Sequence, residues 1–249
     1  MMRFLVPGLS LNVDVVSVPA EVCHHAFRVR RLRVGETFVL NNGLGESSLA
    51  VIDEWSFGNG LARIIGKLEI KTELPLDIVV CQALPKSPER IEQVLQHGTE
   101  LGAAAFHVFA GDRSVARLET KEKVAKRLDR WNNIIRSAAE ESGRAVLPAV
   151  AWHANITDAI ACVDFPLLVL HEEADTSLRS VVKSAIASSN GLALIVGPEG
   201  GLSPAEVDAC KHKAGTAISL GARILRTETA ALAAIAQLSF AFESELEES

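Results

Sequence analysis

The sequence predicts an α/β protein in which a small β-rich domain precedes a larger domain built on a parallel sheet. Residues 1–71 consist of short apolar segments separated by turn signals, whereas residues 72–249 alternate continuous apolar segments with helices. Hydrophobic residues make up 48% of the 249 positions and charged residues 22%, a composition typical of a globular protein that excludes a disordered chain. We therefore expect two domains, residues 1–71 and 72–249.

In the first domain, turns that contain Gly and Asn separate the predicted strands. Residues 41–45 read Asn-Asn-Gly-Leu-Gly and residues 58–60 read Gly-Asn-Gly, and such sequences supply the positive φ angles that tight hairpins need. One helix is expected here, over residues 20–29 after Pro19. The predicted strands are residues 4–6, 13–18, 37–40, 48–54 and 61–65.

In the second domain, apolar strands and helices follow each other in turn. Ser87-Pro88 and Ser203-Pro204 each predict a helix start with Ser at the N-cap, and Glu206 completes a capping box at the second. Such an alternation indicates a parallel sheet covered on both faces. The predicted strands are residues 77–82, 105–109, 165–170, 192–196 and 216–220, and the helices begin near residues 88, 120, 178, 204 and 227.

The predicted last helix, residues 227–242, is apolar nearly all round. Eleven of the thirteen residues from 230 to 242 are apolar, and Gln237 and Ser239 are the exceptions. We therefore expect this helix to be buried on most sides, either in a core or against another subunit.

Charge is distributed unevenly along the chain. The net charge is −6, yet four arginines between residues 28 and 33 have no acidic residue among them, and residues 111–130 carry 7 basic against 4 acidic residues. Basic patches of this kind are typical of polyanion binding, but runs of charged residues are also common on surfaces that only face solvent. The unbalanced acidic residues lie at the end of the chain, at Glu243, Glu245, Glu247 and Glu248.

The sequence gives no sign of export, a membrane span or a metal site. The apolar runs are shorter than the ~18 residues of a membrane helix, and Pro7 and Gly8 interrupt the stretch where a signal peptide would be apolar, so we expect a cytoplasmic protein. The four cysteines, at positions 23, 81, 162 and 210, are too far apart for a zinc knuckle or a disulfide framework and predict buried thiols. Adjacent His24 and His25 cannot both face one metal from a helix.

Three loops at predicted strand ends contain residues that composition does not explain. His171-Glu172-Glu173 follows one strand, the glycine-rich residues 197–201 follow the next, and residues 221–229 follow the last. In an open α/β sheet, ligands bind beyond the carboxyl ends of the strands, and glycines let the backbone approach a ligand closely. The sequence holds no Walker A, GxGxxG, GxSxG or HExxH motif, so these loops are the best candidate for a site.

Arg226-Thr227-Glu228-Thr229 stands where the last helix should begin. A hydroxyl at the N-cap is expected there, but an arginine beside a helix N-terminus is unfavourable because the helix dipole prefers an anion. Arg226 is therefore a candidate for function, unless it simply pairs with Glu228.

The sequences of two of these loops resemble those of a known family. Residues 196–203 (Val-Gly-Pro-Glu-Gly-Gly-Leu-Ser), 220–221 (Leu-Gly) and 223–230 (Arg-Ile-Leu-Arg-Thr-Glu-Thr-Ala) are similar to the signature of the 16S ribosomal RNA uridine-N3 methyltransferases, which belong to the SPOUT superfamily of S-adenosylmethionine-dependent enzymes. The similarity extends over most of the chain. Further matching segments are residues 82–86, 99–102, 112–115 and 142–144, and His25 with Arg28 to Arg33.

The resemblance implies a fold, a cofactor and an assembly. The α/β chain would have an N-terminal PUA-like β-barrel that binds RNA and a C-terminal SPOUT parallel sheet with a deep trefoil knot, paired into a homodimer through the second domain. S-adenosylmethionine would bind in the knot without any metal. The residues onto which the resemblance places it are Leu170, His171, Glu172, Gly197, Pro198, Glu199, Gly200, Gly201, Leu220, Gly221, Ile224, Leu225 and Arg226.

The implied reaction also assigns roles to side chains. Uridine N3 must lose its proton, and a guanidinium can stabilise the resulting anion. Arg226 is the first candidate for that role and Arg144, from either subunit, the second, while Glu228 is either the base or the residue that orients Arg226. The basic residues implied in binding 16S rRNA, within the small ribosomal subunit, are His25, Arg28, Arg30, Arg31, Arg33, Lys86, Arg90, Arg113 and Arg117.

Three other functions compete with this one. A SPOUT enzyme could modify another RNA such as tRNA, and a non-catalytic protein could bind RNA through the first domain alone. A nucleotide-binding α/β enzyme of another class is disfavoured because the glycine-rich loop has no phosphate-binding lysine.

Overall fold

The computed structural model describes residues 1–56, 59–118 and 120–247. The chain divides into two compact units: Met1–Glu73 with Ala139–Leu147, and Leu74–Ala138 with Pro148–Ser249. The first unit thus includes a segment from much later in the chain. Of the sequence predictions, Gly58 in the second hairpin turn and Glu248 in the acidic end lie outside the described residues, as do the side chains of the other acidic residues at that end.

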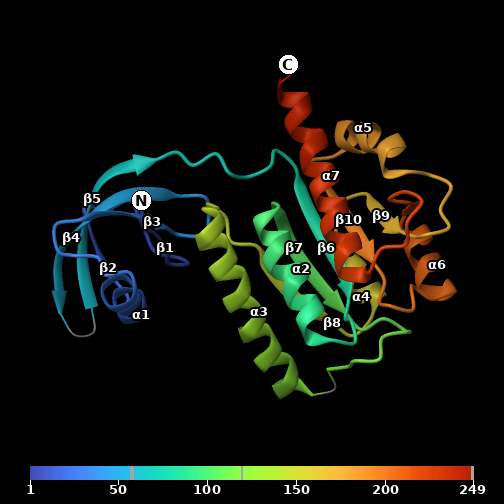
Figure 1. The fold of residues 1–249 in the computed structure, drawn as a ribbon, viewed down its shortest axis with the longest axis horizontal. Helices are drawn as coiled ribbons and strands as arrows, with labels where there is room; N and C mark the ends of the chain where they lie inside the picture. The colour runs from blue at the N-terminus through green and yellow to red at the C-terminus, as the bar shows by residue number, and fades with distance from the viewer. Residues whose placement is uncertain (57–58, 119, 248–249) are drawn as a thin grey trace. The chain divides into compact units, whose positions relative to one another are not determined.

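The first unit is a curled five-stranded sheet with one helix (Figure 1). Its order is β1-β3-β4-β5-β2, and only β1 and β3 pair in parallel. Register shifts between Leu49 and Ala50 and between Ile52 and Glu54 interrupt the β4–β5 ladder, and such bulges bend a sheet. The strands are β1 (Arg3–Leu5), β2 (Val15–Val18), β3 (Thr37–Asn41), β4 (Ser47–Ser56) and β5 (Asn59–Leu68).

The predicted helix and first turn of this unit are confirmed. The helix runs as α1 (Ala20–His24) and continues into a single π-helical turn, η1 (His25–Val29). In the turn, Gly43 has a φ of 72°, and its N–H donates to Oδ1 of Asn41 at 2.7 Å. Phe4 and Phe38 pack edge to face in a core that the sheet and helix share.

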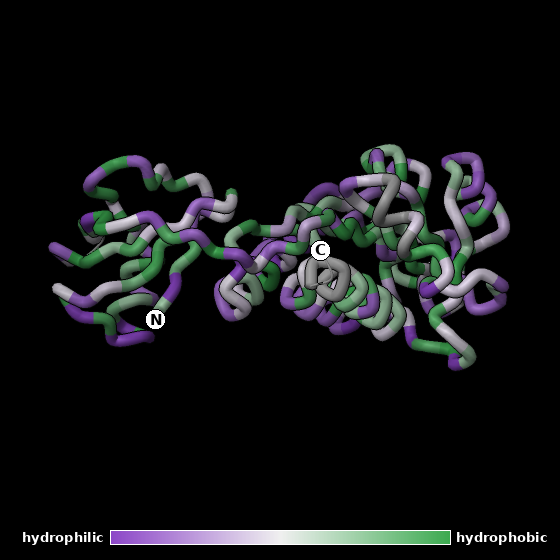
Figure 2. Tube along the Cα trace, turned by 90° about the horizontal axis from the view of Figure 1, so that it is seen from above, coloured by the Kyte–Doolittle hydropathy of each residue, from purple (hydrophilic) through white to green (hydrophobic). Residues whose placement is uncertain are grey.

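The second unit is a six-stranded, fully parallel sheet of order β11-β9-β10-β6-β7-β8, which confirms the predicted sheet (Figure 1). In Figure 2, hydrophobic residues occupy its interior and hydrophilic ones its outer loops. The strands are β6 (Asp77–Ala83), β7 (Ala103–Phe109), β8 (Ala149–His153), β9 (Leu167–Leu170), β10 (Gly191–Val196) and β11 (Thr216–Ile218).

Helices cover both faces of this sheet, as its continuous apolar strands require. One face packs against α4 and α6, and the other against α2, α5 and α7. On the second face, a side chain at Gly98 of α2 would collide with Phe106 of β7, so glycine allows the helix to approach the sheet. The helices are α2 (Pro88–Glu100), α3 (Lys121–Ser142), α4 (Ile156–Ala161), α5 (Leu178–Ser188), α6 (Pro204–His212) and α7 (Thr227–Glu247).

The two predicted N-caps differ in the structure. At α6 the capping box is present, with Ser203 and Glu206 each bonded to the other's backbone N–H. At α2 the Ser87 hydroxyl does not cap the helix but donates to the carboxylate of Glu89. The predicted positions of Ser87 at the N-cap and of Pro88 in the first turn are confirmed, but the Ser87 hydroxyl accepts no hydrogen bond from the helix backbone.

The last helix confirms its prediction over residues 227–242 and extends it to Glu247. Ala231, Ala234, Ile235 and Leu238 are fully buried against the rest of the unit, whereas Phe240 is 74% exposed. Within a single chain, α7 is therefore not buried on most of its sides, although the sequence had predicted such burial in a core or against another subunit. Among the described residues, no helix is long and apolar enough to cross a membrane.

Candidate functional site

The three predicted strand-end loops of the second unit line one cavity of about 940 Å³. The cavity is bordered by residues 170–173 after β9, residues 196–202 after β10 and residues 220–227 after β11, with Arg90 and Arg113 at its side. The structure therefore brings together the segments that the sequence singled out. All thirteen residues onto which the resemblance places the cofactor are among those that line the cavity.

The glycine-rich loop depends on two glycines for its shape. Gly201 has a φ of 70°, which side chains rarely tolerate, and its N–H donates to the Pro198 carbonyl at 2.9 Å. A Cβ atom on Gly197 would lie 2.9 Å from the backbone nitrogen of Leu202. The loop therefore closes tightly on itself and presents main-chain groups to the cavity.

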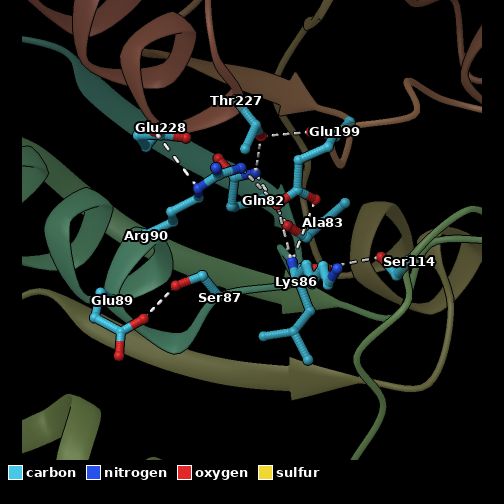
Figure 3. Close-up of polar contacts among 12 residues, drawn as sticks. Gln82, Ala83, Lys86, Ser87, Glu89, Arg90, Ser114, Glu199, Thr227 and Glu228 are labelled. Atoms are coloured by element: carbon cyan, nitrogen blue, oxygen red, sulfur yellow. Dashed lines mark hydrogen bonds and ion pairs between the residues drawn. The ribbon is translucent and has the colours of Figure 1, made fainter.

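Thr227 joins three elements instead of capping α7. Its hydroxyl donates to the Gly197 carbonyl at 2.6 Å and accepts from Nε2 of Gln82 at 2.8 Å (Figure 3). The predicted N-cap role of this hydroxyl was therefore wrong. It ties the end of β6 and the loop after β10 to the start of α7.

Gln82 is a site residue that sequence reasoning placed in a matching segment without a role. Its side chain is fully buried, and Nε2 also donates to the Ala83 carbonyl at 3.0 Å. Its Oε1 has no hydrogen-bond partner among the described residues. The signal that could have found it is a lone polar residue at the end of an apolar strand.

Arg90 of α2 lies between two glutamates beside the cavity (Figure 3). Its Nη1 donates to Oε1 of Glu199 at 2.7 Å, and its Nε lies 3.8 Å from Oε1 of Glu228. Glu199 also accepts from the backbone N–H of Lys86, at 3.1 Å and 3.2 Å. This network holds the start of α2 against the glycine-rich loop.

Glu228 pairs with Arg90 and not with Arg226. The side chain of Glu228 is mostly buried, and its Oε2 has no hydrogen-bond partner among the described residues. The side chain of Arg226 is exposed at the cavity, and its guanidinium makes no hydrogen bond or ion pair with the described part of the chain. The ion pair between Arg226 and Glu228, which would have given Arg226 a structural role, is therefore absent.

Arg144 lies in the first unit, where its guanidinium is only 5% exposed and paired with Glu73. Glu73 also accepts from the N–H groups of Ala145 and Val146 at 3.0 Å and 3.2 Å. Burial favours a raised pKa for Glu73, but the hydrogen bonds and charge of Arg144 and these two N–H groups outweigh it and hold the pKa below its ordinary value. A catalytic role for Arg144 stays a prediction.

The predicted RNA-binding residues divide between the units. In the first, the arginines at 28, 30, 31 and 33 are exposed, and Nε of Arg30 donates to Nε2 of His25 at 3.4 Å. Phe27 stacks on Trp55 in the same unit, with ring centroids 4.4 Å apart. In the second unit, Arg90 and Arg113 line the cavity, whereas Lys86 and Arg117 do not.

The cysteine prediction needs one correction. Cys23, Cys81 and Cys210 are buried, but Cys162 is exposed because it lies at the C-terminal end of the short helix α4. Neither α4 nor β8 was predicted from the sequence. Burial raises the pKa of Cys81 to about 12 and that of Cys210 to about 11, so these two thiols stay protonated near neutral pH.

Comparisons with known proteins agree with this geometry. The family model of an RNA methyltransferase domain matches residues 72–239, and that of an RNA methyltransferase PUA domain matches residues 18–54. The chain is 36% identical to the ribosomal RNA small subunit methyltransferase E of Mycobacterium bovis, over 94% of this chain and 89% of that protein. It is 33% identical to the protein of the same name from Bacillus subtilis, over 91% and 90%.

Two solved structures show the same fold with a bound ligand. The ribosomal RNA small subunit methyltransferase E of Neisseria gonorrhoeae, bound to S-adenosyl methionine, superposes with a TM-score of 0.86 at 30% identity, over 97% of this chain and 98% of that one. A methyltransferase of Legionella pneumophila in complex with the same cofactor gives a TM-score of 0.85 at 32% identity, over 96% and 97%.

Proposed function

This chain belongs to the RNA methyltransferase family, and we propose that it transfers the methyl group of S-adenosylmethionine to N3 of one uridine in the 16S ribosomal RNA. The curated relatives are named as small-subunit ribosomal RNA methyltransferases, and two structural neighbours hold S-adenosylmethionine. The choice of N3 rests on the family resemblance of the loops after β10 and β11.

The cavity at the strand ends is the observation that carries this proposal. At about 940 Å³ it has the size of a site that encloses a small molecule, and three loops supply main-chain groups around it. Leu170, Leu220 and Leu225 offer apolar contacts for an adenine ring. The thirteen residues predicted from the resemblance, from Leu170 to Arg226, are therefore our proposed cofactor site.

Within that site we assign the acid–base work to Glu228 and charge stabilisation to Arg226. S-adenosylmethionine supplies an electrophilic methyl group on a positively charged sulfur. Uridine N3 attacks only after losing its proton, which the unpaired Oε2 of Glu228 can accept. The exposed and unpaired guanidinium of Arg226 is free to donate to the carbonyl oxygens over which the negative charge spreads.

RNA binding is assigned to both units. The exposed arginines of residues 28–33 lie within the segment that matches the PUA domain, and they can contact phosphates. Arg113 and Arg90 bring further positive charge to the cavity of the second unit. Because the target base must leave its stack to reach the cavity, these contacts offset an unstacking cost of a few kcal/mol.

We further propose that the enzyme is a cytoplasmic homodimer that uses α7. This helix is apolar nearly all round, and Phe240 remains 74% exposed on one chain. An exposed aromatic ring on an apolar helix is typical of a subunit interface. Light scattering should give twice the chain mass, and Phe240→Glu should give the monomer.

The decisive experiment supplies radiolabelled S-adenosylmethionine with 16S rRNA, assembled small subunits or bulk tRNA, followed by mass spectrometry of the modified nucleoside. We expect 3-methyluridine in small-subunit RNA and none in tRNA. Label in tRNA alone would establish the rival SPOUT activity. Absence of both label and cofactor binding would leave a non-catalytic RNA-binding protein, and Arg226→Ala serves as the control for background transfer.

A further inference from the structure

Three side chains with metal-ligating atoms meet at the edge of the parallel sheet, outside the proposed active site. They are His107 on β7, His153 on the edge strand β8, and Cys162 at the end of α4, and one ligand atom from each lies within 4.8 Å of the other two. Nδ1 of His107 and Nε2 of His153 are 2.8 Å apart. None of the three lines the cavity at the strand ends.

The fold itself produces this arrangement. In the parallel pair β7–β8, His107 lies opposite Ala151 and Phe109 lies opposite His153, so both histidines project from the same face of the sheet. On that face α4 packs against both strands through a buried apolar side that includes Ile156 and Ile160. Cys162, which directly follows the helix, is thereby brought to the two rings.

Both imidazoles are suited to bind a cation. Burial lowers the pKa of His107, and the nearby His153 lowers it further. Burial also lowers the pKa of His153, and the negative charge of Asp158 opposes this only in part. A neutral imidazole donates a ring-nitrogen lone pair to a metal, and one nitrogen of each ring faces the other ring at 2.8 Å.

We propose that His107, His153 and Cys162 bind one zinc ion, with water in the fourth position. Two imidazoles and a thiolate are the donors that zinc prefers in tetrahedral sites, and exposure of Cys162 gives solvent access. On binding, the cysteine proton is released, the proton between the two facing ring nitrogens moves to the other nitrogen of its ring, and no electron is transferred.

The distances require only small movements. Around a tetrahedral zinc ion, the two nitrogens would be about 3.4 Å apart and each about 3.6 Å from the sulfur, given usual bond lengths. The two ring nitrogens therefore separate by about 0.6 Å from their present 2.8 Å, and the sulfur, which lies within 4.8 Å of both, moves toward them by at most about 1.2 Å. Sγ of Cys162 donates to the Asp158 carbonyl at 3.4 Å, a weak hydrogen bond that leaves the side chain able to turn.

Charges around the cluster permit a cation. The ammonium of Lys213, which follows α6, is bonded to the carbonyls of Ile160 and Val163, and the carboxylate of Asp158 lies near His153. Bound zinc would connect β7, β8 and α4, so its effect is on stability and not on methyl transfer. Zinc then stabilises the folded chain by mass action.

The test uses cobalt(II), which replaces zinc and absorbs visible light when bound tetrahedrally to thiolate. The full chain should bind one cobalt(II) per molecule with a thiolate-to-cobalt band that zinc abolishes, and zinc should raise the Tm. Cys162→Ser, a change at an exposed residue, should abolish the band and weaken zinc binding at least about 10-fold, as should His153→Asn.

His212→Asn, on the exposed surface of α6, is the matched control and should bind metal as the native chain does. The proposal is overturned if the native chain shows no thiolate band, or if Cys162→Ser binds zinc with unchanged affinity. Methyl transfer should be the same in Cys162→Ser, so loss of zinc binding and failure of the proposed function give separate results.

Discussion

An arginine–glutamate network occurs in each unit, and the two networks differ in how completely their atoms are paired. In the first unit, Glu73 receives hydrogen bonds from the Arg144 guanidinium and from two backbone N–H groups. In the second, Glu228 has one distant contact to Arg90 at 3.8 Å and a buried oxygen with no partner among the described residues. A fully paired carboxylate stabilises a fold, whereas a buried, half-paired one retains the capacity to react.

Glu228→Gln tests the reactive side of this comparison and should have the largest effect. The amide keeps the size of the side chain and a hydrogen-bonding oxygen near Arg90, but it cannot accept a proton. We expect single-turnover methyl transfer to slow by ~10²–10⁴-fold, the usual contribution of a general base, with cofactor affinity unchanged. A rate within a few-fold of the native one would assign Glu228 to positioning Arg90.

Glu73→Gln tests the structural side. It leaves the buried guanidinium of Arg144 without its counter-charge, which costs about 3 kcal/mol in the free energy of unfolding. Because the folded pKa of Glu73 is below its ordinary 4.5, the carboxylate stabilises the native state above that pH. Urea denaturation should show this contribution at pH 7 and its loss as the pH falls below about 4.5, toward the folded pKa.

Arg226→Ala removes a cavity arginine whose guanidinium has no partner in the described part of the chain. We expect methyl transfer to slow by ~100-fold, which is the scale of losing one donor to a developing charge. Binding of S-adenosylmethionine, measured by calorimetry, should persist. Unchanged turnover would remove Arg226 from the mechanism, and Arg223→Ala, on the same loop, is the control.

Thr227→Val should have the smallest effect, on stability and cofactor affinity together. It leaves the buried Nε2 of Gln82 with one partner where it had two, at a cost of about 1–2 kcal/mol. Since the same hydroxyl holds Gly197, we expect a weaker affinity for S-adenosylmethionine. The Tm and calorimetry measure the two effects, whereas Thr227→Ser should retain both.

Much of the second unit could be predicted from sequence because its signals are local. Alternating apolar strands predicted the parallel sheet, and the glycines and polar residues after three strands predicted the cavity. The capping box at Ser203 depends only on residues three apart and was confirmed. Where residues close in sequence decide the structure, sequence reasoning was sufficient.

The remaining features depend on contacts between distant residues. Thr227 looked like an N-cap, but Gly197 and Gln82 compete for its hydroxyl from 30 and 145 positions away. Cys162 looked like a buried thiol because α4, with six residues, is too short to show helical periodicity. The His107–His153 contact joins strands that are separated by 46 positions and cannot be found without the pairing register.

The late segment Ala139–Leu147 closes the first unit through several specific bonds. Arg3 donates to the Gly143 carbonyl, the N–H of Leu5 donates to Glu140, and Asn41 donates to the Arg144 carbonyl. Dividing the chain at a single position therefore cannot separate the two units intact. A fragment that stops at Glu73 lacks residues 139–147, which are hydrogen-bonded to β1 and β3. A fragment that starts at Leu74 keeps those residues but lacks Glu73, the partner of Arg144. To express the two units separately, residues 139–147 would have to be fused to the first unit and replaced by a short linker in the second.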